Sequence, residues 1–232
     1  MEAKELILES KTKKLYSTNN EDQIVIEFLD TIPGLKQKST MKGKAEINLD
    51  ISAFIFEYLE SYNVPTHFIR RIDSKSFLAK KLNMFPLKVV LWNVATSTLS
   101  KRLGLKDGTV LDTPVLELYL KNSKLKDPLI NDYHAYTLGL CERNEMNAIV
   151  RISTKVNAVL KSLFMRKKLA LVYFELEFGK TGSQIMIGDE ISPDTFHIWD
   201  QAEPDKLDKK SFLITPETAK KVYPKIKERI LQ

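Results

Sequence analysis

A strict period of two runs through residues 173–178 and constrains the fold more than any other feature of the sequence. Phe174, Leu176 and Phe178 fall on one face of an extended chain, and Glu175 and Glu177 fall on the other. Such alternation is typical of a β-strand with one face in the core and one face open. We therefore predict a half-buried strand with an acidic face.

A turn and a second apolar run follow this strand. Residues 179–183, Gly-Lys-Thr-Gly-Ser, supply turn chemistry, so residues 184–188 are expected to return as the second strand of a hairpin. If Glu177 lies opposite Ile187, Asp189 faces Glu175 on the same side of the sheet. Carboxylates gathered in this way repel one another unless a cation lies between them, and hard oxygen ligands with a phosphate substrate suit Mg²⁺. A metal site at the end of the hairpin is the expectation.

The next stretch of the chain is acidic. Residues 189–200 contain four carboxylates, among them Asp189 and Asp194, together with a turn proline. Composition alone favours a solvated surface loop, because loops are commonly polar. The hairpin in front of it favours a site for a metal or a polar substrate, and both interpretations stay open at this point.

Composition bounds the class of protein. With 232 residues, 43% of them hydrophobic, the chain can bury a sizeable core as one large domain or two closely packed ones. The single Cys141 excludes an intramolecular disulfide, and with three scattered histidines it forms no zinc-ligand spacing. No apolar run approaches the ~20 residues that span a bilayer, and the N-terminus is unlike a signal peptide. We expect a soluble cytoplasmic protein without a membrane anchor.

The net charge of +6 is spread along the chain, since the basic residues are interleaved with 30 acidic ones. This pattern argues against nucleic acid as a partner and fits small anionic substrates. Two basic clusters stand out. Lys36, Lys38, Lys42 and Lys44 form either a solvated loop or a phosphate-facing one.

The second basic cluster lies near the N-terminus, where Lys11 and Lys13 share one face of an extended segment. Two ammonium groups placed in this way suit phosphate binding. Taken alone, the motif favours a solvated edge strand that is protected by its lysines.

The periodicities predict a mixed α+β fold in two regions. Residues 1–85 read as a β-rich part, with a strand over 24–29 and helical spacing over 51–59. The apolar run 87–95 opens a second part, residues 86–232, in which residues 145–166 form a long amphipathic helix.

Several separate motifs resemble the SAICAR synthetase family, in the same order and spacing over nearly the whole chain. The matching segments are Ser-Lys-Thr-Lys-Lys-Leu-Tyr at 10–16, Lys-Gly-Lys at 42–44, Thr-His-Phe-Ile at 66–69, Leu-Ser-Lys-Arg-Leu-Gly at 99–104, Leu-Glu-Phe-Gly at 176–179 and the acidic segment 189–194. The resemblance implies an α+β fold that binds ATP and Mg²⁺ between a β-rich N-terminal part and a mixed C-terminal part. It also implies a homo-oligomer.

The activity that this resemblance implies is an ATP-dependent ligase, which activates a carboxylate as an acyl phosphate and joins it to the amino group of aspartate. Such chemistry needs cations around the phosphoryl oxygens. By motif position, Lys11 and Lys13 contact phosphates and act in catalysis, Lys81 and Met84 meet the nucleotide base, Glu177 and Asp189 hold Mg²⁺, and Asp194 belongs to the substrate side.

Departures from the family pattern gather where the phosphoribosyl substrate binds. Asn93 is retained, but Trp92 and His197 each stand where the family has an arginine, and Thr98 ends a changed Ala-Gly-Ser motif. Glu175 replaces a lysine of the family. Two guanidinium groups suited to bidentate phosphate binding are thus absent, so a ribose phosphate would be poorly held.

Three functional hypotheses remain. The leading one is a ligase whose carboxylate substrate lacks the phosphoribosyl group, because the ATP and Mg²⁺ residues persist while the substrate residues change. Trp92 then offers a stacking face, although a role in the core explains it equally well. The alternatives are a divergent SAICAR synthetase of purine biosynthesis and a non-catalytic nucleotide-binding scaffold.

Overall fold

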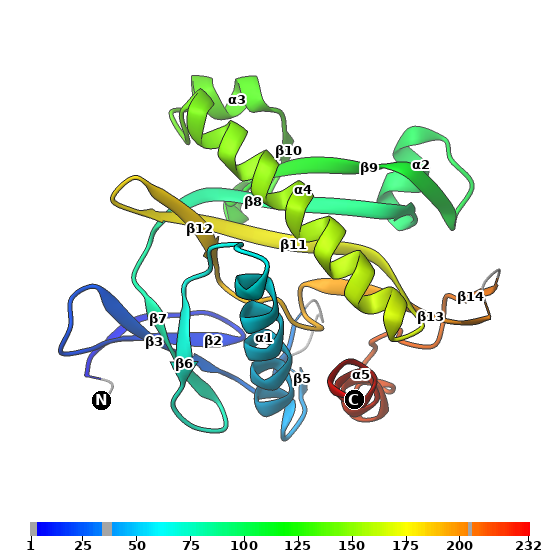
Figure 1. Cartoon of the computed structure of the whole chain (residues 1–232), viewed down its shortest axis with the longest axis horizontal. Helices are drawn as coiled ribbons and strands as arrows, with labels where there is room; N and C mark the ends of the chain where they lie inside the picture. Colours follow the sequence, from blue (N-terminus) through cyan, green and yellow to red (C-terminus); the bar gives the residue numbers. More distant parts are fainter. Residues whose placement is uncertain (1–3, 34–38, 204–205) are drawn as a thin grey trace.

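The structure is a computed structural model that describes residues 4–33, 39–203 and 206–232. Within these ranges the chain forms an α+β fold with two main antiparallel sheets (Figure 1). None of the described helices is long and apolar enough to cross a membrane. The predicted fold class is confirmed.

The first sheet has five strands in the order β1-β2-β3-β7-β6. Their bounds are Leu6–Glu9 for β1, Lys13–Ser17 for β2, Gln23–Phe28 for β3, Phe68–Arg71 for β6 and Ser76–Lys80 for β7. The helix α1 (Lys44–Ser61) packs against this sheet, with Phe56 in ring contact with Phe68 and Phe77. The short pair β4 (Thr31–Ile32) and β5 (Ser39–Thr40) lies apart from it.

The second sheet has seven strands and is built around two long ones, β8 (Asn83–Ala95) and β11 (Leu169–Thr181). The others are β9 (Thr109–Leu120), β10 (Leu129–Ile130), β12 (Gln184–Gly188), β13 (Phe196–Glu203) and β14 (Lys206–Asp208). The helix α4 (Arg143–Arg166) lies across one face of this sheet (Figure 1). The shorter helices are α2 (Ser97–Leu103), the 3-10 turn η1 (Ser123–Leu125) and α3 (Asp132–Thr137).

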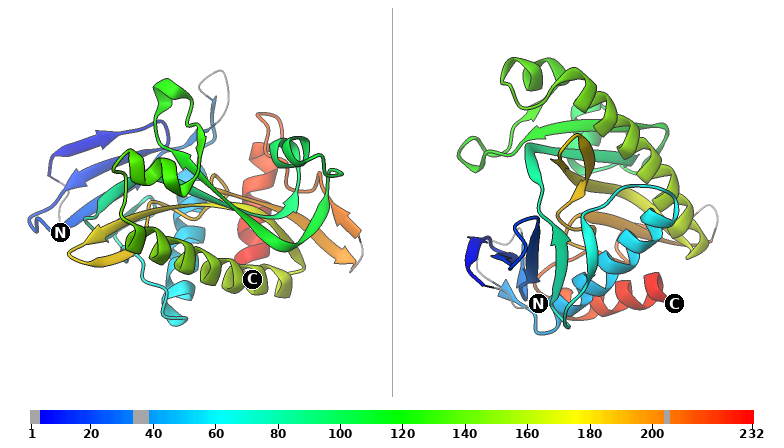
Figure 2. Two further views of the ribbon diagram at one scale, coloured as in Figure 1. Left: turned by 90° about the horizontal axis from the view of Figure 1, so that it is seen from above. Right: turned by 60° about the vertical axis from the view of Figure 1, so that its left-hand side comes forward.

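The last helix, α5 (Ala219–Leu231), packs beside α1 (Figure 2). Its Lys227 Nζ lies 2.5 Å from Asp50 of α1, and Arg229 Nη1 lies 2.9 Å from Asp200 of β13. Contacts to two elements thus hold α5 against both halves of the molecule.

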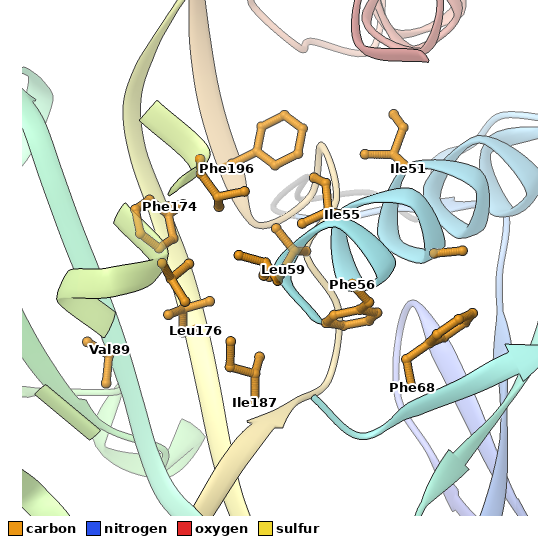
Figure 3. Packing of buried hydrophobic residues seen from close by; sticks show 14 of the residues in the cluster. Ile51, Ile55, Phe56, Leu59, Phe68, Val89, Phe174, Leu176, Ile187 and Phe196 are labelled. Carbon is orange, nitrogen blue, oxygen red and sulfur yellow. The ribbon is translucent and has the colours of Figure 1, made fainter. Parts of the chain in front are cut away.

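One continuous core joins the two sheets. Leu59 and Ile55 of α1 face Leu176 of β11 and Ile187 of β12 across the gap between the sheets (Figure 3). A backbone bridge between Thr66 and Ile187 also ties the two sheets together. The predicted division after residue 85 falls inside β8 and stays a prediction.

The expected hairpin and the expected long helix are confirmed. Strand β11 buries the predicted apolar face, β12 returns over residues 184–188, and α4 covers residues 145–166. The helix begins two residues earlier than expected, at Arg143, because Glu142 and Glu145 form a capping box. Likewise α1 begins at Lys44, directly after Gly43 turns the chain with φ 87°.

The predicted register of the hairpin is wrong by one residue. Glu177 pairs with Gly188, because Thr181 pairs with Gln184 and leaves a two-residue turn. After Gly188 the chain leaves the sheet, since Asp189 adopts the left-handed conformation with φ 61°. Asp189 therefore does not face Glu175, whose carboxylate lies 3.0 Å from Lys88 Nζ instead.

Candidate functional site

A cavity of about 530 Å³ lies between the five-stranded sheet and the β11–β12 hairpin. Its apolar walls come from Leu15 of β2, Ile24 and Ile26 of β3, and Leu82 and Met84 of the segment that enters β8. Six charged residues also line it, namely Lys13, Lys80, Lys81, Lys121, Glu177 and Asp189. We call this space the first cavity.

Two glycines bring the β8 segment close to the hairpin. A Cβ on Gly179 would lie 2.6 Å from Leu82 Cβ and 3.1 Å from the Asn83 carbonyl oxygen. A Cβ on Gly188 would lie 2.9 Å from Met84 Cε. Because Leu82 Cβ and the Asn83 backbone cannot easily move, glycine at position 179 lets the β8 segment approach the hairpin, whereas at position 188 only the flexible end of Met84 would have to shift.

The Lys13 ammonium is buried at one end of the first cavity. It contacts the Asp189 carboxylate and lies 2.9 Å from Glu190 Oε1. Burial alone would lower the pKa of Lys13, but the two carboxylates outweigh it and raise the pKa above its usual range. Lys13 therefore remains a cation.

The two carboxylates predicted to bind metal lie in this cavity together. Burial raises the pKa of Glu177, and the nearby Asp189 carboxylate raises it further, while the contacting Lys121 ammonium opposes the shift. Burial also opposes ionisation of Asp189, but Lys13 outweighs it and lowers the pKa of that carboxyl. The Glu177 and Asp189 carboxylates are thus held near each other, with the Lys121 ammonium beside the first and the Lys13 ammonium beside the second.

A buried histidine supports the strained backbone at Asp189. His67 Nε2 donates to the Asp189 carbonyl oxygen at 3.0 Å, and the ring lies edge-on to Phe56 with centroids 5.5 Å apart. Burial lowers the pKa of His67 to about 4, so the ring is neutral and keeps its proton on Nε2. A residue other than glycine with positive φ persists only where its surroundings hold it, and such sites gather near functional groups.

Three of the residues predicted to bind nucleotide line the first cavity, namely Lys13, Lys81 and Met84. Lys11 lies in the exposed bend before β2 instead. Lys121, which sequence reasoning missed, enters from the end of β9. Nothing in its local sequence separates it from the other lysines nearby.

The loop 189–195 leads from the first cavity to a second one. Glu190 is buried, and its Oε2 accepts hydrogen bonds from the Ser192 hydroxyl and from Asn48 Nδ2, the latter at 3.4 Å. Ser192 Oγ in turn accepts from the Asp194 backbone N–H at 3.1 Å. The acidic segment is therefore a folded structure and not a solvated loop.

The Asp194 carboxylate is held from two elements. Lys44 Nζ of α1 lies 2.5 Å from Oδ2, and Tyr223 of α5 donates its hydroxyl to Oδ1 at 2.6 Å. Burial and the Asp194 carboxylate raise the pKa of Tyr223, so its hydroxyl stays protonated. Lys44 is fully buried, so it is neither part of a solvated loop nor a phosphate-facing residue, while Lys36 and Lys38 lie outside the described residues.

The second cavity has a volume of about 430 Å³ and is lined by aromatic and polar side chains. Tyr173, Trp199 and His197 contribute rings, and Asp194 and Lys209 contribute charges. The Lys209 ammonium lies 2.8 Å from Asp107, a further residue of this wall.

His197 faces this space as a neutral group. Its Nε2 accepts a hydrogen bond from Trp199 Nε1–H at 3.0 Å, so the proton of the ring resides on Nδ1. Burial lowers the pKa of His197. The imidazole thus offers a neutral N–H donor.

Of the residues predicted to bind the carboxylate substrate, Asp194 and His197 line the second cavity. Trp92 is 6% exposed, donates its indole N–H to Glu117 at 3.0 Å and packs on Tyr173 with ring centroids 4.6 Å apart. Asn93 exchanges hydrogen bonds with Asn157 in the core, at 2.8 and 3.0 Å.

Two more of these predicted residues lie away from the second cavity. Thr98 is exposed on α2, and Glu175 is paired with Lys88. The substrate roles of Trp92, Asn93, Thr98 and Glu175 stay predictions.

Charged groups of both signs around an apolar cavity fit an enzyme that uses a nucleotide, and the comparisons with known proteins give its class as an ATP-dependent ligase that forms a carbon–nitrogen bond. A family model described as SAICAR synthetase matches residues 6–230. The chain belongs to that family, as its motifs predict.

Similar proteins agree with this assignment along the whole chain. A phosphoribosylaminoimidazole-succinocarboxamide synthase of Thermoanaerobacter sp. (strain X514) is 43% identical over 215 residues, which cover 91% of each chain. The crystal structure of the synthase from Ehrlichia chaffeensis has a TM-score of 0.90 at 31% identity and covers 98% of both chains. A SAICAR synthetase solved in complex with ADP has a TM-score of 0.89 at 38% identity, with 96% of both chains covered.

Proposed function

We propose that this ligase uses ATP to activate a carboxylate as an acyl phosphate and then joins it to the amino group of aspartate or a related amino acid. The observation that carries the proposal is the first cavity, where Lys13, Lys121, Glu177 and Asp189 meet beside an aliphatic wall. The wall suits a purine base, and the charged end suits a polyphosphate with its cation. The ADP complex of a relative supports a nucleotide in this fold.

Mg²⁺ fits the residues at the charged end. Glu177 lies close enough to Asp189 for the Asp189 carboxylate to raise the pKa of Glu177, and a dication between the two would relieve their repulsion. The described residues contain no cluster of three or more side chains that could hold a metal, which suits Mg²⁺, since it is often bound by one or two carboxylates, phosphate oxygens and water. When bound, the ion would neutralise charge on the phosphates.

In the proposed reaction, an oxygen of the substrate carboxylate bonds to the γ-phosphorus of ATP, and the bond to the β,γ-bridging oxygen breaks to release ADP. The amine nitrogen then bonds to the acyl carbon, the bond to phosphate breaks, and the amine loses a proton. Lys13 would stabilise the charge on the transferring phosphoryl group, because its ammonium is fixed and buried beside Asp189. Asp194, at the far end of the loop 189–195, would face the second substrate.

The comparisons support phosphoribosylaminoimidazole-succinocarboxamide synthesis as the particular reaction, since that is the activity in the names of the relatives. One observation favours a second candidate, a carboxylate without a phosphoribosyl group. Of the described side chains that line the second cavity, only Lys209 is a fixed cation, and it is already paired with Asp107. A phosphate dianion is better held by several donors of positive charge.

ADP release by the purified protein with Mg-ATP and aspartate tests both candidates. One set of reactions contains the phosphoribosylated aminoimidazole carboxylate, and the other contains a panel of heteroaromatic carboxylates that lack phosphate. Turnover with the phosphoribosylated compound would support the relatives' activity for this protein, and it would exclude a substrate site that accepts only carboxylates without phosphate. Turnover confined to the panel supports the altered carboxylate. Bound ATP without turnover in any reaction would contradict the ligase proposal and favour a nucleotide-binding scaffold.

A further inference from the structure

A single loop separates the two cavities. Asp189, at its start, lines the first cavity, and Asp194, five residues later, lines the second. The loop connects β12 to β13 and passes beside α1, where the Ser52 hydroxyl donates to the Ile191 carbonyl oxygen at 3.1 Å (Figure 1). The two ends of the loop are therefore joined by a short, packed stretch of chain.

Inside the loop, a buried chain of polar contacts links the two ends. Lys13 of the first cavity lies 2.9 Å from Glu190 Oε1, and the Ser192 hydroxyl donates to the other oxygen of Glu190. Ser192 Oγ also accepts the Asp194 backbone N–H at 3.1 Å. Glu190 is 3% exposed and Ser192 0%, and neither lines the cavities described above, so their contacts serve the loop itself.

The far end of this chain is held on the side of the second cavity. Both oxygens of Asp194 are engaged, by Lys44 at 2.5 Å and by Tyr223 at 2.6 Å. The position of Asp194 thus depends on Ser192 through its backbone and on α1 and α5 through its side chain.

We propose that Ser192 is a positioning residue, which couples Lys13 and the phosphate end of the first cavity to Asp194 in the second. Phosphate oxygens that draw the Lys13 ammonium would change its contact with Glu190, and the hydroxyl of Ser192 passes that change to the Asp194 backbone. The route is a contiguous set of hydrogen bonds between buried groups. The inference rests on the proposed function only for the binding of nucleotide to the first cavity.

Hydrogen–deuterium exchange with and without Mg-ADP tests this coupling. In the wild-type protein, Mg-ADP should slow exchange in β2 and in the segment 194–199. In Ser192→Ala, exchange in β2 should still slow, with a dissociation constant for Mg-ADP within about twofold of wild type, because Ser192 is remote from the nucleotide. The protection of 194–199 should fall by roughly fivefold, which corresponds to a coupling of about 1 kcal/mol.

A matched control is available in the core. Ser153 of α4 is also fully buried, and its hydroxyl has no hydrogen-bond partner among the described residues. Ser153→Ala should retain the wild-type response of 194–199, and Ser192→Thr, which keeps a hydroxyl, should restore it. Loss of the response in both alanine variants would indicate a general loosening of the protein and would overturn the specific role of Ser192.

The wild-type measurement by itself also decides the proposal, so it does not depend on the folding of any variant. Bound Mg-ADP that leaves exchange at 194–199 unchanged would overturn the coupling and leave the proposed function intact. A wild-type protein that fails to bind Mg-ADP would overturn the proposed function, and the coupling with it. A response in Ser192→Ala equal to that of wild type would remove Ser192 from the route.

Discussion

The two cavities differ in how they handle charge. In the first, two ammonium groups contact two carboxylates beside an aliphatic wall, and the partners come from distant parts of the chain, as with Lys13 and Asp189. In the second, aromatic rings surround a neutral imidazole, and the Lys209 ammonium is already paired. Under the proposed function, the first arrangement would serve chemistry common to any substrate, and the second would contact the substrate that is accepted.

This contrast indicates which of the two cavities tolerates changes of residue. A phosphoryl-transfer site depends on fixed charges, and the pairs Lys13–Asp189 and Lys121–Glu177 of the first cavity each join two different elements. An acceptor pocket depends on shape and hydrogen-bond donors, which change one residue at a time. The departures from the family pattern at Trp92 and His197 lie in or behind the wall of the second cavity, next to Tyr173.

The largest expected effect is on the first cavity. Glu177→Gln should reduce Mg²⁺-dependent ATP turnover by at least roughly 100-fold, because one of the two anions opposite the phosphates is lost. Steady-state ADP release measures it. Glu27→Gln, a change to another partly buried glutamate that binds the Tyr16 hydroxyl, is the control and should retain activity. An unchanged rate in Glu177→Gln would mean that the charge of Glu177 is not needed for turnover, and the contrast in charge between the two cavities would then have no functional meaning.

The next effect concerns Asp194, which belongs to the second cavity yet is held as firmly as the charges of the first. Lys44→Met leaves a buried carboxylate without its ammonium and should lower the free energy of unfolding by about 3–5 kcal/mol. Tyr223→Phe removes one hydrogen bond to the same carboxylate and should cost about 1–3 kcal/mol. Urea unfolding measures both. Equal losses would show that the lysine contributes no more than a neutral donor.

The wall of the first cavity can be tested by a matched pair of glycine substitutions. Gly179→Ala meets Leu82 Cβ and a backbone carbonyl, which have little freedom to move, and should weaken Mg-ADP binding by about tenfold. Gly188→Ala meets the flexible end of Met84 and should weaken binding by a smaller factor. Isothermal titration calorimetry compares them. The reverse order would mean that the Met84 end of the wall is the more rigid one.

The smallest effect is the contribution of His197, in the wall of the second cavity, to the pH dependence of stability. Burial lowers the pKa of His197, so below about pH 6.5 the unfolded chain binds a proton that the folded protein does not. Stability should therefore fall as the pH falls from about 6.5 toward the pKa of the folded state. Proton NMR should show His197 titrating below its usual range, and His197→Gln should reduce the slope of stability against pH. A His197 midpoint at or above 6.5 would contradict the neutral wall.

Local patterns predicted the hairpin β11–β12 and the helix α4, because alternation and helical spacing depend on which face is buried. They failed on the register, since one residue more or less in the turn moved Glu177 from Ile187 to Gly188. Motif resemblance brought Lys13, Glu177 and Asp189 to attention. It did not reveal Lys121 or Tyr223, whose positions follow from contacts between segments far apart in the sequence.

Strand β11 contributes to both cavities from a single face, with Glu177 in the first and Tyr173 in the second. Four residues of extended chain separate them, a distance of about 13 Å. A hydrogen-bonded strand in the middle of a sheet does not stretch, so this separation is set by covalent geometry and stays constant when side chains change. Substitutions at the Tyr173 end of the strand would therefore leave the distance to the Glu177 end unchanged.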